Sequence, residues 1–230
     1  MKKLTKTQKN IDKIFYSNNR YSLTEASKIV KEISSYTSFN SSIDIAIRLL
    51  IDTRKANQMA RGVVKFPHGN GKYFRVLAFV DKDKQLEAKE AGADFIGSDE
   101  YIIKINKGWT EIDIIITTPN LMPKLVRLGK ILGPKGLMPN PKSGTVTTEI
   151  GKAVKEVKLG KIDFRVDRYG IVHTTIGKAS FEAFQLKENS IELVNTLHHI
   201  KPSSSKGLYI KSVFLSGTMS PGVRVNINSI

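Results

Sequence analysis

The chain has 230 residues, 40% of them hydrophobic, which is enough for one large or two small domains with real cores. Its net charge of +16 exceeds what solubility requires and indicates a polyanionic partner, nucleic acid first and an anionic membrane second. Zero cysteines exclude disulfides, thiolate zinc sites and cysteine nucleophiles. No window reaches the roughly 20 apolar residues of a membrane span, and the basic N-terminus lacks the apolar stretch of a secretory signal. We therefore expect a cytoplasmic protein, or one of an organelle that keeps its own translation.

The first third is predicted to be mixed helix and strand. A helix is expected over about residues 6–16, and Ser22 with Glu25 forms a capping box that opens a second helix. Residues 43–51 alternate apolar and polar side chains, which is typical of a half-buried strand, and 62–66 reads as another strand.

The middle third has a different pattern. Residues 67–71 are rich in turn formers, and near-continuous apolar runs follow at 73–80 and 112–117 with a helix expected over 82–91 between them. Further helices are expected over about 121–128 and 149–158. Strands that are apolar on both faces and alternate with helices predict a parallel sheet covered on both sides.

The last third returns to the first pattern. Residues 162–166 and 171–176 are predicted to form a hairpin around the turn at 167–170. Ser180 is expected to cap a helix that runs to about His199, with an inward face of Phe184, Ile191, Val194 and Leu197. Closing strands are expected at 208–215 and 223–226.

The fold class predicted from these patterns is a discontinuous α+β domain with an inserted, Rossmann-like three-layer α/β domain. Domain I would comprise residues 1–67 and 160–230, and domain II residues 68–159, with a double hinge near 68 and 160. The two flanks hold +12 of the net charge of +16. Domain I is therefore the part of the chain in which a polyanionic partner is mainly expected to bind.

Residues 128–146 carry the most distinctive sequence, LGKILGPKGLMPNPKSGTV. Prolines at 134, 139 and 141 disfavour a helix through this stretch, so we expect an ordered loop. Glycines allow close approach to its backbone, and lysines supply positive charge, which suits an anionic partner. The candidate residues here are Lys130, Gly133, Lys135, Gly136, Asn140 and Lys142. A loop that only packs the two domains together is the alternative.

No motif for catalysis or a cofactor is present. The chain lacks a Walker A sequence, a dinucleotide-binding fingerprint, HExxH and G-x-S-x-G, and its four histidines form no ligand set. The sequence from Gly133 to Gly136 matches the G-x-x-G of KH domains, but Pro139 and Pro141 prevent the helix that should follow. We therefore predict no enzyme, no cofactor and no metal.

The run LGPKGLMPNPK-x-GTV resembles the signature of the ribosomal protein L1 family of the bacterial type. Matching runs occur near the start, at 62–69, at 170–178 and at Thr218 and Met219. The resemblance implies the two-domain fold above and the absence of enzymatic activity. It also implies binding of 23S rRNA in the L1 stalk, help in releasing E-site tRNA, and repression of the protein's own mRNA. The free protein is expected to be monomeric and to bind no membrane.

The resemblance also assigns residues. The polar neighbours of Phe39 alone favour a plug at the edge of the core over a stacking surface. The resemblance reverses this and places Phe39 at the RNA-contacting face, together with Thr218, Met219 and Ser220. Ser220 stands where the family usually has glycine, and Ser38 where lysine is common; a required positive φ at Ser220 would cost on the order of 1 kcal/mol. The basic candidates, which could otherwise form only a solvated face, are Arg54, Lys55, Arg61, Arg165, Arg168, His173 and Lys178.

Three alternatives from other classes remain open at this point. They are a nucleotide-binding α/β enzyme, which the missing phosphate motifs disfavour, a general RNA-binding protein outside the ribosome, and a basic membrane-surface protein. The last is disfavoured because no helix has a long face of Lys and Arg opposite Trp and Phe.

Overall fold

The computed structural model describes residues 5–16, 19–54, 59–202 and 207–229. It divides into two units, one made of residues 1–71 and 163–230 (unit 1) and one made of residues 72–162 (unit 2). Each unit has its own core, and each is described by itself. Within the described residues, no helix is both long enough and apolar enough to cross a membrane.

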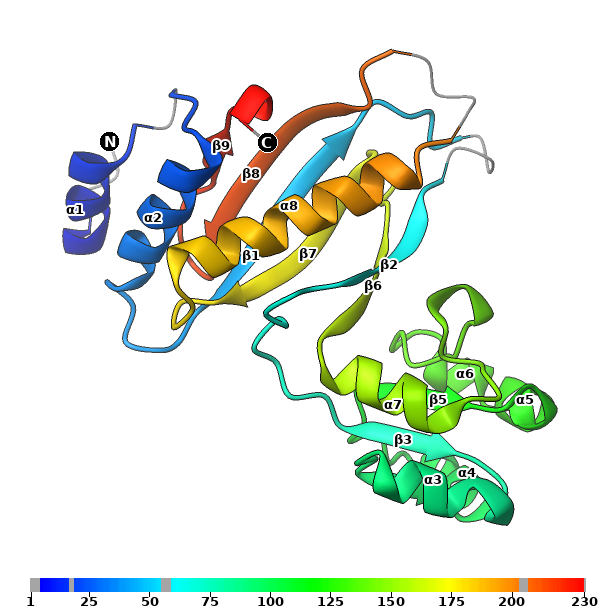
Figure 1. Cartoon of the computed structure of the whole chain (residues 1–230). Coiled ribbons are helices and arrows are strands. Elements are labelled where there is room, and N and C mark those ends of the chain that lie inside the picture. Colours follow the sequence, from blue (N-terminus) through cyan, green and yellow to red (C-terminus); the bar gives the residue numbers. More distant parts are fainter. Residues whose placement is uncertain (1–4, 17–18, 55–58, 203–206, 230) are drawn as a thin grey trace. The chain divides into compact units, whose positions relative to one another are not determined.

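Unit 1 is built on a four-stranded antiparallel sheet in the order β7-β1-β8-β9. The strands are β1 (Ser42–Leu49), β7 (Ile171–Lys178), β8 (Ile210–Gly217) and β9 (Val223–Val225). The helices α2 (Leu23–Ser34) and α8 (Ala183–His199) pack on one face of this sheet (Figure 1). α1 (Lys6–Ile14) precedes them, and a short 3-10 turn, η5 (Ile227–Ser229), follows β9.

Local sequence explains the elements of unit 1 that were predicted well. The capping box of Ser22 and Glu25 opens α2 as expected, since each side chain accepts from the backbone N–H of the other. β1 alternates as expected, with Ile43, Ile45, Ile47 and Leu49 buried. Its polar positions consequently face the side of the sheet that the helices do not cover.

The predicted hairpin at 162–176 is wrong in its pairing. β6 (Lys161–Arg165) forms a separate two-stranded sheet with β2 (Arg61–Lys65), whereas β7 pairs with β1. The two predicted arms meet only in the single bridge between Val166 and Val172, next to the turn. A turn signal fixes the reversal of the chain, but each strand then pairs with the partner that buries its apolar face.

The predicted start of α8 is also wrong. Its N-cap is Glu182, whose side chain forms a capping box with Gln185. Ser180 is instead engaged by Asn40, whose amide donates to the hydroxyl and whose carbonyl oxygen accepts the backbone N–H, both at 3.2 Å. Phe184, expected to point inward, is 57% exposed and lies edge-on against His68.

Unit 2 contains a three-stranded parallel sheet in the order β4-β3-β5, as predicted for a Rossmann-like insert. The strands are β3 (Val76–Phe79), β4 (Phe95–Gly97) and β5 (Ile114–Thr117). One face packs against α4 (Asp99–Asn106), α5 (Met122–Val126) and α6 (Gly129–Leu132), and the other against α3 (Gln85–Glu90) and α7 (Ile150–Lys158). The predicted fold class, discontinuous α+β with an inserted α/β part, is confirmed.

Two details of unit 2 differ from expectation. Strand β4 and helix α4 lie in a segment for which no element was predicted, because a three-residue strand gives no periodic signal. The stretch 128–146 is not loop throughout, since α6 ends at Leu132, just before Pro134. Short 3-10 turns complete the unit: η2 (Lys82–Lys84), η3 (Pro119–Leu121) and η4 (Pro141–Ser143).

Candidate nucleic-acid interface

Ser42, the first residue of β1, joins several of the predicted site residues. Its carbonyl accepts the backbone N–H of Thr218 at 2.9 Å, and its own N–H donates to the Thr218 hydroxyl oxygen at 3.2 Å. The Ser42 hydroxyl accepts from the Lys178 ammonium at 2.8 Å. One end of the sheet therefore carries a serine, a threonine and a lysine in fixed positions. We call residues 37–42, Lys178 and 217–220 the hydroxyl end of the sheet.

Phe39 lies in this hydroxyl end and is not a plug of the core. Its side chain is 50% exposed, and the loop that carries it is held by hydrogen bonds. The Thr37 hydroxyl donates to the carbonyls of Ser34 at 2.7 Å and Phe39 at 3.1 Å. Asn40 bonds twice to Ser180, as described above. The loop thus presents an aromatic ring on a rigid backbone.

The turn after β8 places a second apolar side chain beside Thr218. Met219 is 90% exposed and has a positive φ of 66°, the only non-glycine residue in the described part of the chain that does. A left-handed conformation costs a residue with a Cβ about 1–2 kcal/mol, so surrounding contacts must impose it. Ser220 supplies them: its hydroxyl accepts from the Gly217 N–H at 2.7 Å and donates to the Gly217 carbonyl at 3.0 Å.

The positive φ in this turn therefore belongs to Met219 and not to Ser220. Ser220 has an ordinary backbone, and its hydroxyl closes the turn. Gly217 allows that closure, because a Cβ there would lie 2.6 Å from the Ser34 hydroxyl. The serine is an alternative way of building this turn rather than a strained substitute for glycine.

Two of the basic candidates, Arg54 and Arg168, lie together at the other end of β1. The Thr53 hydroxyl donates to the Arg168 carbonyl at 2.9 Å, which brings the segment of Arg54 beside the turn of Arg168. β1 spans residues 42–49, so this basic end lies about 23 Å from Ser42. The exposed basic side chains are Arg54, Arg165, Arg168 and His173, while Arg61 is half-buried and lies 3.7 Å from Asp163. Lys55 lies outside the described residues.

Asp167 orders the turn at the basic end. Its carboxylate accepts the N–H groups of Tyr169 and Ile171, both at 2.8 Å, and lies 3.6 Å from the His173 ring nitrogen. Partial burial tends to raise the pKa of this carboxyl, but the two backbone hydrogen bonds and His173 outweigh it, and the pKa is lowered. The ionised carboxylate consequently orders the turn that carries Arg168 and lies beside His173 on β7.

Between the two ends lies a polar hollow that the sequence did not predict as part of the site. A cavity of about 370 Å³ opens on the uncovered face of the sheet and is lined by Asp44, His173, Thr175 and Ser216 among others. Thr175 donates to the Asp44 carboxylate at 2.6 Å. The polar alternation of β1 was the available signal, but it does not reveal which strands lie beside it. The predicted residues of unit 1 therefore form two ends of one open sheet face, with this hollow between them.

The stretch 128–146 of unit 2 is held by Asn140. Its side-chain oxygen accepts the Lys142 N–H at 2.8 Å, its own N–H donates to the Thr145 hydroxyl at 2.8 Å, and its carbonyl accepts that same hydroxyl at 3.1 Å. Gly136 has the positive φ expected of a loop glycine, whereas Gly133 is helical and approaches the Gly129 backbone closely. Lys130, Lys135 and Lys142 are exposed, and Lys135 donates to the Thr110 hydroxyl at 2.5 Å.

In the part of the chain that the structure describes, no three His, Asp or Glu side chains are placed to hold a metal ion. His68 pairs with Glu188 at 2.5 Å and stacks edge-on with Phe184, which is a structural role.

Comparison with known proteins identifies the family. The model of the ribosomal protein L1p/L10e family matches residues 30–221. The chain is 57% identical over 230 residues to a protein of Porphyromonas gingivalis, and 56% identical to proteins of Bacteroides thetaiotaomicron and Flavobacterium psychrophilum. Each of these is named large ribosomal subunit protein uL1, and each alignment covers the whole of this chain and at least 99% of the relative. The chain therefore belongs to the ribosomal protein L1 family of the bacterial type, whose members are structural and not enzymes.

Proposed function

We propose that this protein is a structural constituent of the large ribosomal subunit and that unit 1 binds 23S rRNA to build the L1 stalk. The names of the relatives support the first part of this proposal. The second part rests on the arrangement around Ser42. This residue forms direct hydrogen bonds with Lys178 and Thr218, and it follows the exposed Phe39 by three residues in the chain.

The hydroxyl end has the properties needed to recognise RNA by shape. Phe39 and Met219 offer exposed apolar surface for bases or riboses, and the Thr218 backbone and hydroxyl, with Ser42, offer polar groups between them. All of these sit on backbone that is already hydrogen-bonded, so binding orders few groups and loses little entropy. Selectivity would therefore come mainly from this end.

The basic end would supply affinity. Arg54, Arg165 and Arg168 are exposed and lie about one strand length from Ser42, which suits contacts to the phosphates of a folded RNA element. Such contacts are independent of sequence and weaken steeply with salt. Because the hydroxyl end would determine selectivity and the basic end would determine affinity, we expect that substitutions can change these two properties separately.

Two further roles are part of the proposal. The stalk would assist the release of deacylated tRNA from the E site, with the basic stretch 128–146 of unit 2 as a candidate contact. The hydroxyl end would also bind a copy of the rRNA site in the protein's own mRNA leader and repress its translation. The ribosome, in the cytoplasm or an organelle matrix, is the corresponding location.

The experiment is filter binding of the full chain to a stalk fragment of 23S rRNA over a series of salt concentrations, beside an unrelated folded RNA of equal length. We expect selective binding to the stalk fragment and a steep negative slope of log affinity against log salt. Replacement of Arg168 by Gln should reduce that slope by about 1 with little loss of selectivity. Equally tight binding to the unrelated RNA would overturn the proposal.

A further inference from the structure

Unit 2 contains a cavity of about 310 Å³ to which the proposed function gives no role. It is lined by Phe95, Tyr101, Lys104, Lys107 and Trp109. These residues come from β4, from α4 and from the turn that follows α4. The volume lies at the small end of the roughly 300–1,000 Å³ range of ligand pockets, so the cavity suits one small ring system rather than a large ligand.

Three aromatic rings form the wall of this cavity and hold one another in place. The ring centroids of Phe95 and Trp109 are 5.1 Å apart at 90°, and those of Tyr101 and Trp109 are 5.5 Å apart at 43°. Tyr101 is buried, whereas Phe95 and Trp109 are half-buried and keep part of their surface open. The edge-to-face contact of Trp109 with Phe95 and its tilted contact with Tyr101 fix ring orientation, so the wall is a preformed surface for a flat, aromatic group.

Two lysines stand at the rim of the wall. The Lys104 ammonium lies 4.7 Å from the centroid of the Tyr101 ring, and Lys107 is the C-cap residue of α4. Both side chains are exposed, and neither forms an ion pair with any residue that the structure describes. Asp99, in the first turn of the same helix, is paired with Lys124 at 2.8 Å. The two rim charges are therefore available to an anion.

Residues of the stretch 128–146 also lie near this cavity. Lys135 donates to the hydroxyl of Thr110, the residue after Trp109, and Leu137 and Met138 pack on the core cluster that contains Tyr101. A third exposed lysine thus lies beside the aromatic wall.

We propose that this cavity binds a single unstacked nucleobase of RNA, with the base against Trp109 and Phe95 and the adjoining phosphate near Lys104 and Lys107. Each RNA nucleotide carries both a flat base and a negatively charged phosphate. An aromatic wall with lysines at its rim can therefore contact the base and the phosphate of the same nucleotide. An acidic peptide carries its rings and its charges on separate residues and matches this arrangement less well. The site is separate from the hydroxyl end of unit 1 and does not depend on it.

Trp109 provides the test, because it is the only tryptophan in the chain. The full-length protein is titrated with a trinucleotide of adenosine, too short to form a folded element, while Trp109 fluorescence is recorded. We expect saturable quenching that weakens with salt, and no quenching by an abasic ribose-phosphate trimer. Replacement of both Lys104 and Lys107 by Gln should weaken binding about tenfold and lower the salt slope by about 1 for each lysine.

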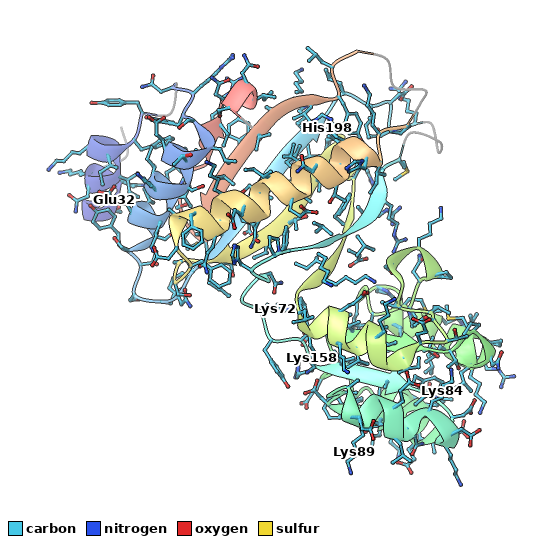
Figure 2. The ribbon with its side chains drawn as sticks, viewed as in Figure 1. Glu32, Lys72, Lys84, Lys89, Lys158 and His198 are labelled. Atoms are coloured by element: carbon cyan, nitrogen blue, oxygen red, sulfur yellow. The ribbon has the colours of Figure 1, made fainter. Side chains whose placement is uncertain are left out.

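A matched control carries the same change of charge on the other face of the sheet. Lys82 and Lys89 are exposed, and α3, which bears Lys89, packs against the core cluster of Val76, Ala78 and α7 (Figure 2). The double variant Lys82→Gln with Lys89→Gln should bind the trinucleotide within about twofold of the parent. Melting temperatures of both double variants report whether either change disturbs folding.

Several outcomes would overturn the proposal. They are an absence of quenching by the trinucleotide, equal quenching by the abasic trimer, and equal weakening by the control variant. Quenching only by an acidic peptide that contains phenylalanine would make the cavity a protein-docking site. Filter binding of the stalk fragment by the Lys104 and Lys107 variant is expected to be unchanged, so failure here is distinguishable from failure of the proposed function.

Discussion

Thr218 and Ser42, 176 residues apart in the chain, are joined by hydrogen bonds through both the backbone and the threonine hydroxyl. The backbone bond continues the pairing of β8 with β1, and the hydroxyl caps the end of that pairing. The same residue therefore completes the sheet and faces the proposed RNA surface. A change at Thr218 must be designed to separate these two effects.

The combined change of Phe39→Ala and Thr218→Ala should weaken binding to the stalk fragment by roughly 30-fold or more, since it removes an exposed ring and a fixed hydroxyl. Lys135→Ala, in unit 2, should weaken it by less than about threefold because it removes one phosphate-type contact at most. Filter binding at one salt concentration measures both. Thr218→Ser keeps the hydroxyl and is the matched control; the opposite ranking would move the principal RNA site to unit 2.

Ser220 gives a prediction about stability. Its hydroxyl makes two hydrogen bonds to the backbone of Gly217, so Ser220→Ala should lower the free energy of unfolding by about 1 kcal/mol. Ser220→Gly should lower it at least as much, because the backbone at this position needs no positive φ and glycine adds freedom to the unfolded chain. Urea unfolding followed by circular dichroism gives both values. A more stable glycine variant would show that the turn is strained by serine.

The sequence predicted those features that local chemistry determines. The alternation of β1, the capping box of Ser22 and the apolar runs of β3 and β5 all identify their elements without knowledge of neighbours. The fold class followed from the contrast between alternating strands and continuously apolar ones. The polar neighbours of Phe39 marked it as unusual, but its assignment to an RNA-contacting face, like that of Thr218, came from resemblance to a family and not from a local pattern.

The features that were missed depend on distant partners. β6 pairs with β2 rather than with β7, and Ser180 is engaged by Asn40, 140 residues away, instead of capping α8. The positive φ of Met219, set inside the turn from Gly217 to Ser220, and the cavity beside Trp109, formed where β4, α4 and the turn after α4 pack together, likewise leave no periodic signal. Periodicity and turn chemistry describe one segment at a time, so they cannot assign such contacts.

Asn189 should be essential to the stability of unit 1. It is fully buried on α8, accepts the His68 N–H at 3.3 Å, and donates to the carbonyls of Gly69 at 2.8 Å and Ile176 at 2.7 Å. Asn189→Ala removes this partner from one buried and two part-buried backbone groups and should cost about 2–4 kcal/mol. Asn195→Ala, at an exposed position of the same helix, should change stability by less than about 0.5 kcal/mol. Similar losses for the two variants in urea unfolding would contradict this role.

Asp94 and Lys158 should make the stability of unit 2 depend on pH. The Lys158 ammonium lies 2.6 Å from the Asp94 carboxylate, which also accepts from the Tyr73 hydroxyl at 2.6 Å and the Val76 N–H at 2.7 Å. Partial burial tends to raise the pKa of Asp94, but these hydrogen bonds outweigh it and lower the pKa below its ordinary 3.8. Burial likewise tends to lower the pKa of Lys158, yet its bonds to Asp94 and Tyr73 raise it above 10.5.

The directions of the two pKa shifts define how the stability of unit 2 should depend on pH. A carboxyl whose pKa is lowered by folding stabilises the fold above its unfolded pKa, and this contribution disappears as the pH falls through the folded pKa. Asp94→Asn should therefore cost about 1–2 kcal/mol at neutral pH, and the difference from the parent should shrink as the pH falls below 3.8. Trp109, which lies in unit 2, reports its unfolding by fluorescence. Asp99→Asn, which breaks a more exposed ion pair with Lys124, is the control and should cost less than about 0.5 kcal/mol. A loss on Asp94→Asn that is the same at pH 2 and pH 7 would show that the ionised pair does not stabilise this unit.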